Sequence, residues 1–377
     1  MPPVAERQRH LLHVFSTFAV GGQQRRFVQL ANVLGAKYRH SIIAMDGDFA
    51  AAKGLDRGVP YVLEKMAVHK TATISLANLL NARRLLHGIA PDMLVTYNWG
   101  TIEWAIANRL RAPCRHIHVE DGFGPEESPE RQLWRRAKAR HLLLARCDQV
   151  IVPSLVLHDL ATRTWRLPTN KVCYLPNGID CRRFATTPDA ALAAALGIRE
   201  GTAVVGTVAA LRREKNLVRL IRVFAALSRS IEAQLVIVGD GPERPVLVQA
   251  AADLGVAPQV VFAGTLDQPE RLLGRFDVFA LTSDTEQMPY SVLEAMAAGL
   301  PVAATDVGDV KRMVAPENTE FVVSAADEDA LEHGLRRLLK DPLLRTQIGG
   351  ANRLRVHREY AMDQMIERYD GLFSGPQ

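Results

Sequence analysis

Two kinds of apolar segment alternate along the first half of the chain. Short continuous apolar runs predict buried strands, and longer stretches with apolar positions every three or four residues predict amphipathic helices. The expected strands are Leu11–Ser16, His40–Ala44, Met93–Thr96, Arg115–Val119 and Gln149–Val152. The expected helices are Gln23–Leu34, Leu76–Leu86 and Gln132–Ala145. Strands separated by helices of this length indicate βαβ units and a parallel sheet.

The same alternation starts again in the second half. Strands are expected at Ala203–Ala209, Gln234–Val238, Val260–Phe262 and Asp277–Leu281, and helices at Leu217–Leu227, Arg244–Leu254, Leu331–Leu339 and Arg353–Tyr369. Between the halves, Pro176 and the Asn177-Gly178 pair form a turn signal. A chain of 377 residues has the length of two domains. The pattern therefore predicts an α/β protein of two similar domains, with a boundary near Leu175–Asp180.

One stretch of the second half, Ser283–Val302, combines a polar loop with a short helix between two apolar strands. Pro289 suits the first turn of that helix, and Gly299 with Pro301 ends it. Ligands of α/β proteins bind beyond the C-terminal ends of the strands, and a helix start there favours an anion. The loop carries Glu286, and the apolar helix carries Glu294. A buried carboxylate at Glu294 needs hydrogen-bond donors, which sugar hydroxyls would supply.

This stretch resembles the signature of family 4 glycosyltransferases, E-G-x-P-x-x-x-x-E-A-x-A-x-G-x-P-V. The matching positions are Glu286, Pro289, Glu294, Ala295, Ala297, Gly299, Pro301 and Val302, whereas Gln287 and Met288 depart from the usual form. The alternative is a buried helix with a capping glutamate.

The family consists of retaining enzymes of the GT-B fold that use nucleotide sugars. The resemblance therefore implies two Rossmann-like domains that face each other across a cleft. Residues 1–176 would bind the acceptor and residues 177–356 the nucleotide sugar. A C-terminal helix, about 357–377, would pack back on the first domain.

The resemblance also assigns the donor site. Gly21 and Gly22 follow a strand and open a helix, so they would let the backbone approach the donor pyrophosphate. Lys215 matches the family cation that neutralises the leaving diphosphate. The family arginine falls at Ala210, so Arg212 or Arg213 would replace it. The expected donor-binding residues are Gly21, Gly22, Arg212, Lys215, Gly239, Gly241, Gly264, Leu266, Glu286, Met288, Pro289 and Glu294.

The expected acceptor site lies at the end of the strand Arg115–Val119. His118, Glu120 and Asp121 gather there, and relatives often read H-x-E-H-G where this chain has Asp121 at the last position. The alternative is a structural histidine. The resemblance implies catalytic roles for His118, Asp121, Lys215 and Glu286. Lys215, Gly22 and the loop Gln287–Tyr290 would stabilise the diphosphate. Glu286 would hold the sugar hydroxyls and Glu294 the ribose hydroxyls.

Charge adds one further element. The net charge of +5 and the pI of 9.1 are compatible with anionic ligands or a membrane surface, and are too modest to indicate nucleic acid. Residues 130–146 combine Trp134 with the basic residues Arg131, Arg135, Arg136, Lys138, Arg140 and Arg146. With Ser128 as the cap and Pro129 in the first turn, this pattern is typical of a helix that lies on a membrane surface. A solvated basic helix is the alternative. We expect a cytoplasmic protein, peripheral on the inner face of the cell membrane.

The remaining expectations concern metal and reaction. Asp46-Gly-Asp48 fits the D-x-D motif of metal-dependent GT-A enzymes, but two aspartates are common in turns, so neither a metal nor another cofactor is expected. The resemblance implies retaining transfer from a UDP-sugar to a glycan, lipid-linked or small-molecule acceptor, in polysaccharide or glycolipid biosynthesis. Two alternatives stay open: a non-hydrolysing UDP-sugar 2-epimerase, and a non-catalytic nucleotide-sugar-binding protein, which the alanine at 210 favours.

Overall fold

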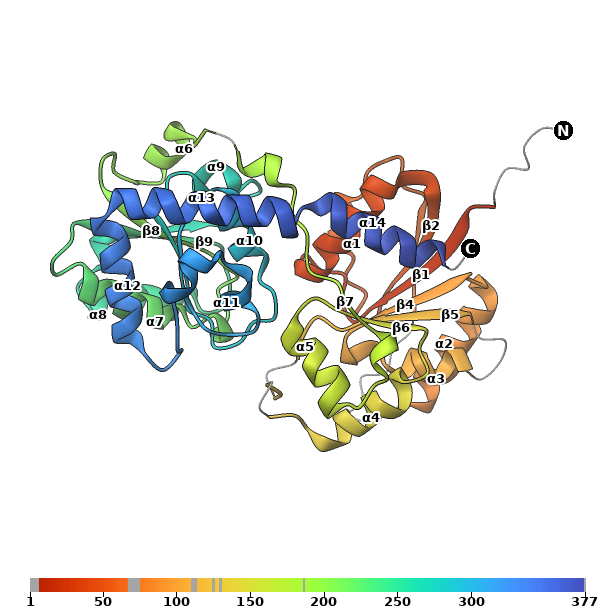
Figure 1. The fold of residues 1–377 in the computed structure, drawn as a ribbon. Helices are drawn as coiled ribbons and strands as arrows, with labels where there is room; N and C mark the ends of the chain where they lie inside the picture. The colour runs from red at the N-terminus through yellow and green to blue at the C-terminus, as the bar shows by residue number, and fades with distance from the viewer. Residues whose placement is uncertain are drawn as a thin grey trace. The chain divides into compact units, whose positions relative to one another are not determined.

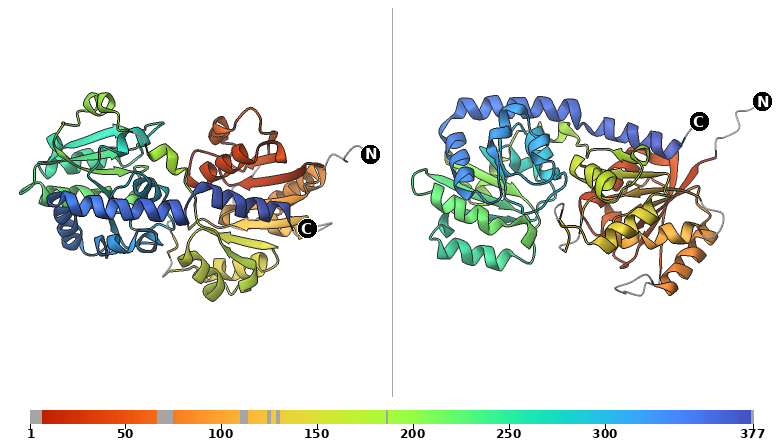
Figure 2. Two further views of the ribbon diagram at one scale, coloured as in Figure 1. Left: turned by 45° about the horizontal axis from the view of Figure 1, so that its top comes forward. Right: turned by 60° about the horizontal axis from the view of Figure 1, so that its bottom comes forward.

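The chain forms two compact units, each built on one parallel sheet with helices on both faces (Figures 1 and 2). The computed structural model describes residues 7–66, 75–109, 114–123, 126–128, 131–185 and 187–375. Unit 1 comprises Met1–Pro176 and Met365–Gln377, and unit 2 comprises Asn177–Gln364. The chain thus leaves unit 1 after Pro176 and returns to it at Met365.

The sheet of unit 1 has seven strands in the order β3-β2-β1-β4-β5-β6-β7. They are β1 (Arg9–Phe15), β2 (Tyr38–Ala44), β3 (Tyr61–Glu64), β4 (Met93–Tyr97), β5 (Arg115–Val119), β6 (Gln149–Val152) and β7 (Val172–Tyr174). All neighbouring pairs are parallel. The strand order reverses between β1 and β4, which creates a topological switch point at their C-terminal ends. Ligands of open α/β sheets bind at such points.

The helices of unit 1 cover the two faces of this sheet. Those described are α1 (Gly22–Leu34), α2 (Leu76–Ile89), α3 (Glu103–Arg109), α4 (Trp134–Leu144), α5 (Leu155–Asp159) and α14 (Met362–Ser374). Phe27 of α1 and Phe373 of α14 both contact the ring of His13, so these two helices share one face. Ala82 of α2 and Trp104 of α3 pack with Leu12 of β1 on the opposite face.

The sheet of unit 2 has six strands in the order β10-β9-β8-β11-β12-β13. They are β8 (Ala203–Val208), β9 (Ala233–Val238), β10 (Val260–Gly264), β11 (Val278–Leu281), β12 (Val302–Thr305) and β13 (Val322–Val323), again all parallel. The order reverses between β8 and β11. The second switch point therefore lies where the Ser283–Val302 stretch begins.

Eight α-helices are described in unit 2, together with short 3-10 turns. They are α6 (Ala190–Ala195), α7 (Leu217–Leu227), α8 (Arg244–Asp253), α9 (Glu270–Leu273), α10 (Tyr290–Ala297), α11 (Val310–Met313), α12 (Glu328–Lys340) and α13 (Pro342–Glu359). Two apolar clusters fill the two faces of the sheet. Phe279 of β11 belongs to one cluster and its neighbours Val278 and Ala280 to the other, as expected for a strand that is buried on both sides.

The predicted fold class, two parallel α/β domains, is confirmed. The sequence analysis placed no strand at β3, β7 or β13, which are edge strands. The expected helix 132–145 begins at Trp134, with Leu133 at its N-cap. Ser128, the expected cap, therefore does not cap α4, and Pro129, expected in the first turn, lies outside the described residues. Among the helices that the structure describes, none is long and apolar enough to cross a bilayer.

Candidate functional site

Two residues that lie far apart in the sequence meet at the switch point of unit 2. Lys215 follows β8 and Glu286 follows β11, and Lys215 Nζ donates to Glu286 Oε1 at 2.5 Å. Ser283 Oγ donates to the same carboxylate oxygen at 2.8 Å. The two side chains remain partly accessible, with 25% of Lys215 and 10% of Glu286 exposed. The ammonium of Lys215 and the carboxylate of Glu286 are therefore both within reach of a ligand at the strand ends.

The backbone around Lys215 is braced against the loop that carries Glu286. Asn216 adopts the left-handed conformation, caps α7, and donates from Nδ2 to Asp284 Oδ1 at 3.0 Å. Thr282 Oγ1 donates back to the carbonyl of Asn216 at 3.1 Å. These bonds fix the position of Lys215 relative to Glu286. Arg212 and Arg213, the candidates to replace the family arginine, are exposed.

The predicted glycine turns allow close backbone approach. A Cβ on Gly239 would lie 1.9 Å from the carbonyl oxygen of Ala209, and one on Gly241 would lie 2.5 Å from that of Leu211. Gly264 has φ +69°, and its carbonyl accepts a hydrogen bond from Gly239 N at 2.7 Å. The turns after β9 and β10 are thus joined at the same edge of the sheet.

The sequence analysis missed Gly308, whose backbone packs against the loop that carries Glu286. Gly308 has φ +57°, and a Cβ there would lie 2.4 Å from the carbonyl oxygen of Glu286. The next residue, Asp309, donates from its backbone N to the carbonyl of Gln287 at 2.9 Å. The available signal was a glycine just past the end of β12, at the ligand-binding edge of the sheet.

The helix α10 begins directly after Pro289, its N-cap residue. Met288 is buried, and its carbonyl accepts from Asn177 Nδ2 at 2.9 Å. Leu266 is partly buried against the same apolar cluster. Glu294 lies buried within α10, as the surrounding apolar sequence predicts. The predicted donor residues of unit 2 thus belong to the loops and helix at one end of the sheet, where Arg212 is exposed.

In unit 1, the start of α1 and the ends of β4 and β5 are joined by polar side chains. Asp121 accepts two hydrogen bonds from Arg26, at 2.7 Å from Nη1 and 2.6 Å from Nη2. Asn98 Oδ1 accepts from Asp121 N at 2.7 Å, and Asn98 Nδ2 donates to Gln23 Oε1 at 3.4 Å. Asn98 has φ +57°, a strained conformation of a kind that is concentrated at functional sites.

Gly21 and Gly22 lead into this cluster. Gly21 is extended and precedes α1, and a Cβ there would lie 2.7 Å from Gln24 Oε1. The first hydrogen bond of the helix runs from Arg25 N to Gly21 O. The backbone N–H groups of residues 22–24 therefore have no partner within the helix and point out of its start. Sequence reasoning missed Arg26 and Asn98. The position of Asn98 directly after a strand was the signal that could have found it.

The three predicted acceptor residues divide between two environments. Asp121 is 16% exposed in the cluster just described. The side chains of His118 and Glu120 are fully buried, and His118 Nε2 lies 3.2 Å from Glu120 Oε2. The expectation that all three contact the acceptor does not fit this geometry. Successive strand residues point to opposite faces, and His118 and Glu120 lie on the face that α4 covers.

The predicted basic helix also contains a buried cation. Arg140 is fully buried and forms two hydrogen bonds to Glu127, at 3.2 and 3.1 Å. Its guanidinium carbon lies 4.7 Å from the ring centroid of Trp165. Arg140 therefore cannot contact a membrane surface, contrary to the expectation for residues 130–146. The exposed residues of this segment include Arg131, Leu133, Trp134, Arg135, Lys138 and Leu142.

The Asp46-Gly-Asp48 motif forms a turn. Asp46 Oδ1 accepts from Asp48 N at 3.0 Å, and Asp48 Oδ1 accepts from Ala50 N at 2.8 Å. Both carboxylates thus bond to the local backbone, as in Asx-turns. Among the residues described, no group of three or more His, Cys, Asp or Glu side chains is arranged to hold a metal ion.

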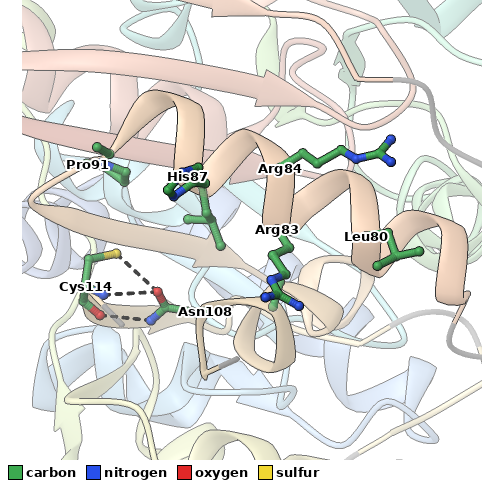
Figure 3. Close-up of a pocket in the computed structure, with 10 residues that line it drawn as sticks. Leu80, Arg83, Arg84, His87, Pro91, Asn108 and Cys114 are labelled. Atoms are coloured by element: carbon green, nitrogen blue, oxygen red, sulfur yellow. Dashed lines mark hydrogen bonds between the residues drawn. The ribbon is translucent and has the colours of Figure 1, made fainter. Parts of the chain in front are cut away.

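A separate hollow of about 680 Å³ lies beside α2 and α3 (Figure 3). Its lining includes Pro91, just before β4, and Cys114, just before β5. It therefore lies at the N-terminal edge of the sheet, away from Asp121. Cys114 Sγ lies 3.3 Å from Asn108 Oδ1 (Figure 3), and burial raises the pKa of Cys114 to about 11. Because α/β sheets bind ligands at the opposite edge, this hollow is not part of the candidate site.

Two family models match the chain in succession. Residues 20–183 match the model described as Glycosyltransferase Family 4, and residues 189–355 match the model described as Glycosyl transferases group 1. The two matched segments correspond to the two units that the structure separates. Together they include every predicted site residue.

Two curated relatives illustrate the family. The N-acetyl-alpha-D-glucosaminyl L-malate synthase of Bacillus anthracis is 27% identical over 228 residues, 60% of each chain. A GDP-mannose-dependent monoacylated alpha-(1-6)-phosphatidylinositol monomannoside mannosyltransferase of Corynebacterium glutamicum is 33% identical over 212 residues. That match covers 53% of this chain and 55% of the relative. In both cases the matched region is little more than half of the relative's length.

The fold has solved counterparts along almost the whole chain. The crystal structure of Anabaena HepE in complex with UDP aligns with a TM-score of 0.81 and 19% identity, covering 97% of this chain and 100% of that one. At this identity the likeness shows the fold alone. Because the two family models together match residues 20–183 and 189–355, this chain belongs to the family 4 glycosyltransferases, and the structural likeness gives it the GT-B fold.

Proposed function

We propose that this protein transfers a sugar from a UDP-sugar to a hydroxyl group of a glycan, lipid-linked or small-molecule acceptor, with retention at the anomeric carbon. The carrying observation is the 2.5 Å pair of Lys215 and Glu286 at the switch point of unit 2. Unit 2 would hold the donor and unit 1 the acceptor. The pathway would be polysaccharide or glycolipid biosynthesis.

The donor half of this proposal rests on charge that develops during the reaction. As the glycosidic bond breaks, negative charge grows on the leaving diphosphate, and a fixed cation stabilises it. Lys215 would supply that cation, together with the amides at the start of α10. Glu286 Oε1 accepts from Lys215 and Ser283, so Oε2 would accept from a sugar hydroxyl. Glu294 would bind the ribose hydroxyls.

The acceptor half rests on Asp121. Arg26 donates two hydrogen bonds to it and fixes the plane of the carboxylate. Each oxygen retains a lone pair that can accept from an acceptor hydroxyl. His118 and Glu120 would support the end of β5 without touching the acceptor. The proton of the attacking hydroxyl would pass to the departing phosphate, so no separate enzymic base is assigned.

The donor base needs an experimental test. A UDP complex is known for the structural neighbour, whereas the relative with 33% identity is named as GDP-mannose-dependent, which favours GDP-mannose as the second candidate. A thermal-shift screen of UDP, GDP, ADP and their sugars would identify the base, because a ligand that binds the native state stabilises it. Transfer assays with the selected donor follow. A failure of all nucleotide sugars to bind or react would refute the proposal.

Product analysis separates the remaining alternatives. A transferase releases the nucleoside diphosphate and forms a new glycoside only when an acceptor is present. A non-hydrolysing 2-epimerase would change the sugar of the donor without any acceptor. A non-catalytic binding protein would bind the donor and return it unchanged.

We also propose that no metal ion or other cofactor takes part. Lys215 and the start of α10 would stabilise the leaving diphosphate without a metal cation. Activity should persist in EDTA after dialysis. Loss of activity that manganese restores would contradict this and direct attention back to Asp46 and Asp48.

The exposed face of α4 is the candidate for membrane contact. Trp134 is 69% exposed and Leu142 is also exposed, with Arg135 and Lys138 between them. The triple variant Arg131→Gln, Arg135→Gln, Lys138→Gln should weaken binding to vesicles containing phosphatidylserine by roughly 1 kcal/mol per charge.

A matched control tests whether net charge alone explains this result. The control triple variant Arg229→Gln, Lys340→Gln, Arg358→Gln removes the same charge from exposed positions in unit 2. Equal weakening by both variants, or no vesicle binding by the wild type, would refute the membrane proposal.

A further inference from the structure

A continuous chain of buried polar side chains runs beneath α4 to the end of β5. Cys147 Sγ lies 3.2 Å from His116 Nδ1, and His116 Nε2 lies 2.8 Å from Thr96 Oγ1. Thr96 Oγ1 lies 2.8 Å from His118 Nδ1, and His118 Nε2 lies 3.2 Å from Glu120 Oε2. All five side chains are buried. The chain ends one residue before Asp121.

The donors and acceptors available on each side chain determine where the protons of this chain lie. Burial lowers the pKa of His116 to about 3, so its ring is neutral and carries one N–H. The Thr96 hydroxyl has one proton, so it donates to one ring and accepts from the other. Glu120 Oε2 lies within hydrogen-bond distance of His118 Nε2, so a proton on Nε2 leaves Nδ1 as the acceptor for the Thr96 hydroxyl. The rings are thereby held in one tautomer, and Glu120 is held at the end of the strand.

Arg140 occupies the far side of Glu120. Its Nε lies 3.6 Å from Glu120 Oε2, and its Nη atoms bond to Glu127. Three aromatic rings enclose the guanidinium, with centroids at 4.7 Å for Trp165, 5.1 Å for Trp99 and 5.6 Å for Phe123. Burial of such charges is costly, and well-packed apolar residues of similar volume often give equal or greater stability.

Two residues of this network, Glu120 and Trp99, are sequence neighbours of residues in the candidate acceptor site. Glu120 precedes Asp121 directly, and Trp99 follows the strained Asn98 directly. Asn98 in turn accepts the hydrogen bond from Asp121 N. Any displacement of Arg140 and the aromatic rings around it would therefore also displace Asp121 and Asn98, which shape the candidate acceptor site.

We propose that Arg140 is a positioning residue for the reaction proposed above. Through Glu120 and Trp99 it would hold the end of β5 and the turn after β4, so that Asp121 and Asn98 keep the geometry that orients the acceptor. This inference rests on the proposed function of unit 1. Arg140 itself touches no substrate, because it is fully buried.

The test uses the full chain and the double variant Glu127→Gln, Arg140→Met. Removing both partners avoids a lone buried charge at Glu127, and Glu120 keeps its contact with His118, so the fold should persist in circular dichroism. The donor KM should stay within about twofold, whereas kcat/KM for the acceptor should fall about 10- to 100-fold, as small misplacements of orienting groups do. The control Tyr38→Phe removes partly buried hydrogen bonds to α14 and should leave acceptor kinetics unchanged.

A second measurement does not require activity. The amide of Asp121, bonded to Asn98 Oδ1, should exchange its hydrogen at least about tenfold faster in the double variant, while amides of β2 remain unchanged. A wild type without transferase activity would refute the proposed function, and exchange would still report on the network. Unaltered exchange, or wild-type acceptor kinetics in a folded double variant, would overturn the inference.

If the double variant does not fold, Thr96→Val and Thr96→Ser test the same path, because Thr96 bonds to His118 and His118 to Glu120, through which Arg140 would act. Valine has the same shape as threonine but cuts the chain between the two rings, whereas serine keeps the hydroxyl. Thr96→Val should show the acceptor defect and faster Asp121 exchange, and Thr96→Ser should restore both. Equal behaviour of the two variants would overturn the inference.

Discussion

The two units share a parallel-sheet architecture but place their polar groups differently. In unit 1, buried polar side chains lie on the strands themselves, including His13, His40, Thr96, His116 and His118. In unit 2, the buried sheet is mainly hydrocarbon. Its candidate site belongs to loops beyond the strand ends, with Lys215 and Glu286 as the main charges.

The two units therefore support their candidate binding sites in different ways. Unit 2 presents a rigid apolar sheet and assigns recognition to the loops. Unit 1 extends hydrogen-bonded networks from its interior to the site, on the α4 side through His118 and on the other side through His13, which lies 3.1 Å from both Tyr97 and His40. Unit 1 should therefore be more sensitive to protonation, and unit 2 to changes in its loops.

Acid should destabilise unit 1 selectively. Burial lowers the pKa of His40 to about 4 and that of His116 to about 3, from an ordinary value of 6.5. The unfolded state then binds more protons below pH 6.5. The stabilisation from the neutral rings is complete above pH 6.5 and is lost as the pH falls toward 4 and 3. At about 1.4 kcal/mol per pKa unit, the loss reaches several kcal/mol by pH 4.

Tryptophan fluorescence reports this loss directly, since all four tryptophans (Trp99, Trp104, Trp134 and Trp165) belong to unit 1. The urea midpoint measured by fluorescence should fall steeply between pH 6.5 and 4. A midpoint that does not change over this range would show that the buried rings do not govern the stability of unit 1.

In unit 2, Lys215→Ala should lower turnover about 100- to 1,000-fold, similar to the loss of a group that stabilises developing negative charge. The effect should fall on kcat more than on the donor KM, because the partner charge grows in the transition state. Lys340→Ala, which removes an exposed cation of the same unit, serves as the control. A Lys215→Ala protein with normal kcat and a raised donor KM would assign Lys215 to ground-state binding instead.

Gly308→Ala should damage the same loop through the backbone. The added Cβ would meet the carbonyl oxygen of Glu286 at 2.4 Å, in addition to the strain of φ +57°. We expect a loss of about 2 kcal/mol in stability and about tenfold in turnover. Gly197→Ala has φ +81° with no atom within 4 Å of the added Cβ, so it measures the backbone strain alone. Equal effects of the two substitutions would dismiss the contact with Glu286.

The sequence predicted the fold and the loops of unit 2 because both depend on local patterns. Apolar periodicity located the central strands, and a spaced motif located Glu286 and Glu294. The edge strands β3, β7 and β13 were not predicted, because β3 is largely exposed, β7 has only three residues and β13 only two. The convergence of Lys215 and Glu286 required only that both follow neighbouring strands.

The acceptor site was less predictable for a physical reason. Alternation along β5 separates His118 and Glu120 from Asp121, but which face α4 covers is a tertiary property. Arg140 looks like any cation of a basic helix, and its burial depends on Glu127 and on three aromatic rings from distant segments. Asn98 and Gly308 act through backbone conformations that the residue type alone does not reveal.

The most direct test of the account is nucleotide binding and turnover by Glu294→Gln. The substitution keeps the size of the side chain and most of its packing in α10. If Glu294 accepts from two ribose hydroxyls, each charge-assisted bond, worth roughly 1.5–3 kcal/mol, loses about half of its strength. Calorimetric titration with the nucleoside diphosphate should then show affinity about ten- to a hundredfold weaker in a protein that remains folded. A folded Glu294→Gln protein with wild-type affinity and turnover would contradict the assignment of this helix to the donor. A variant that does not fold would make Glu294 a structural carboxylate.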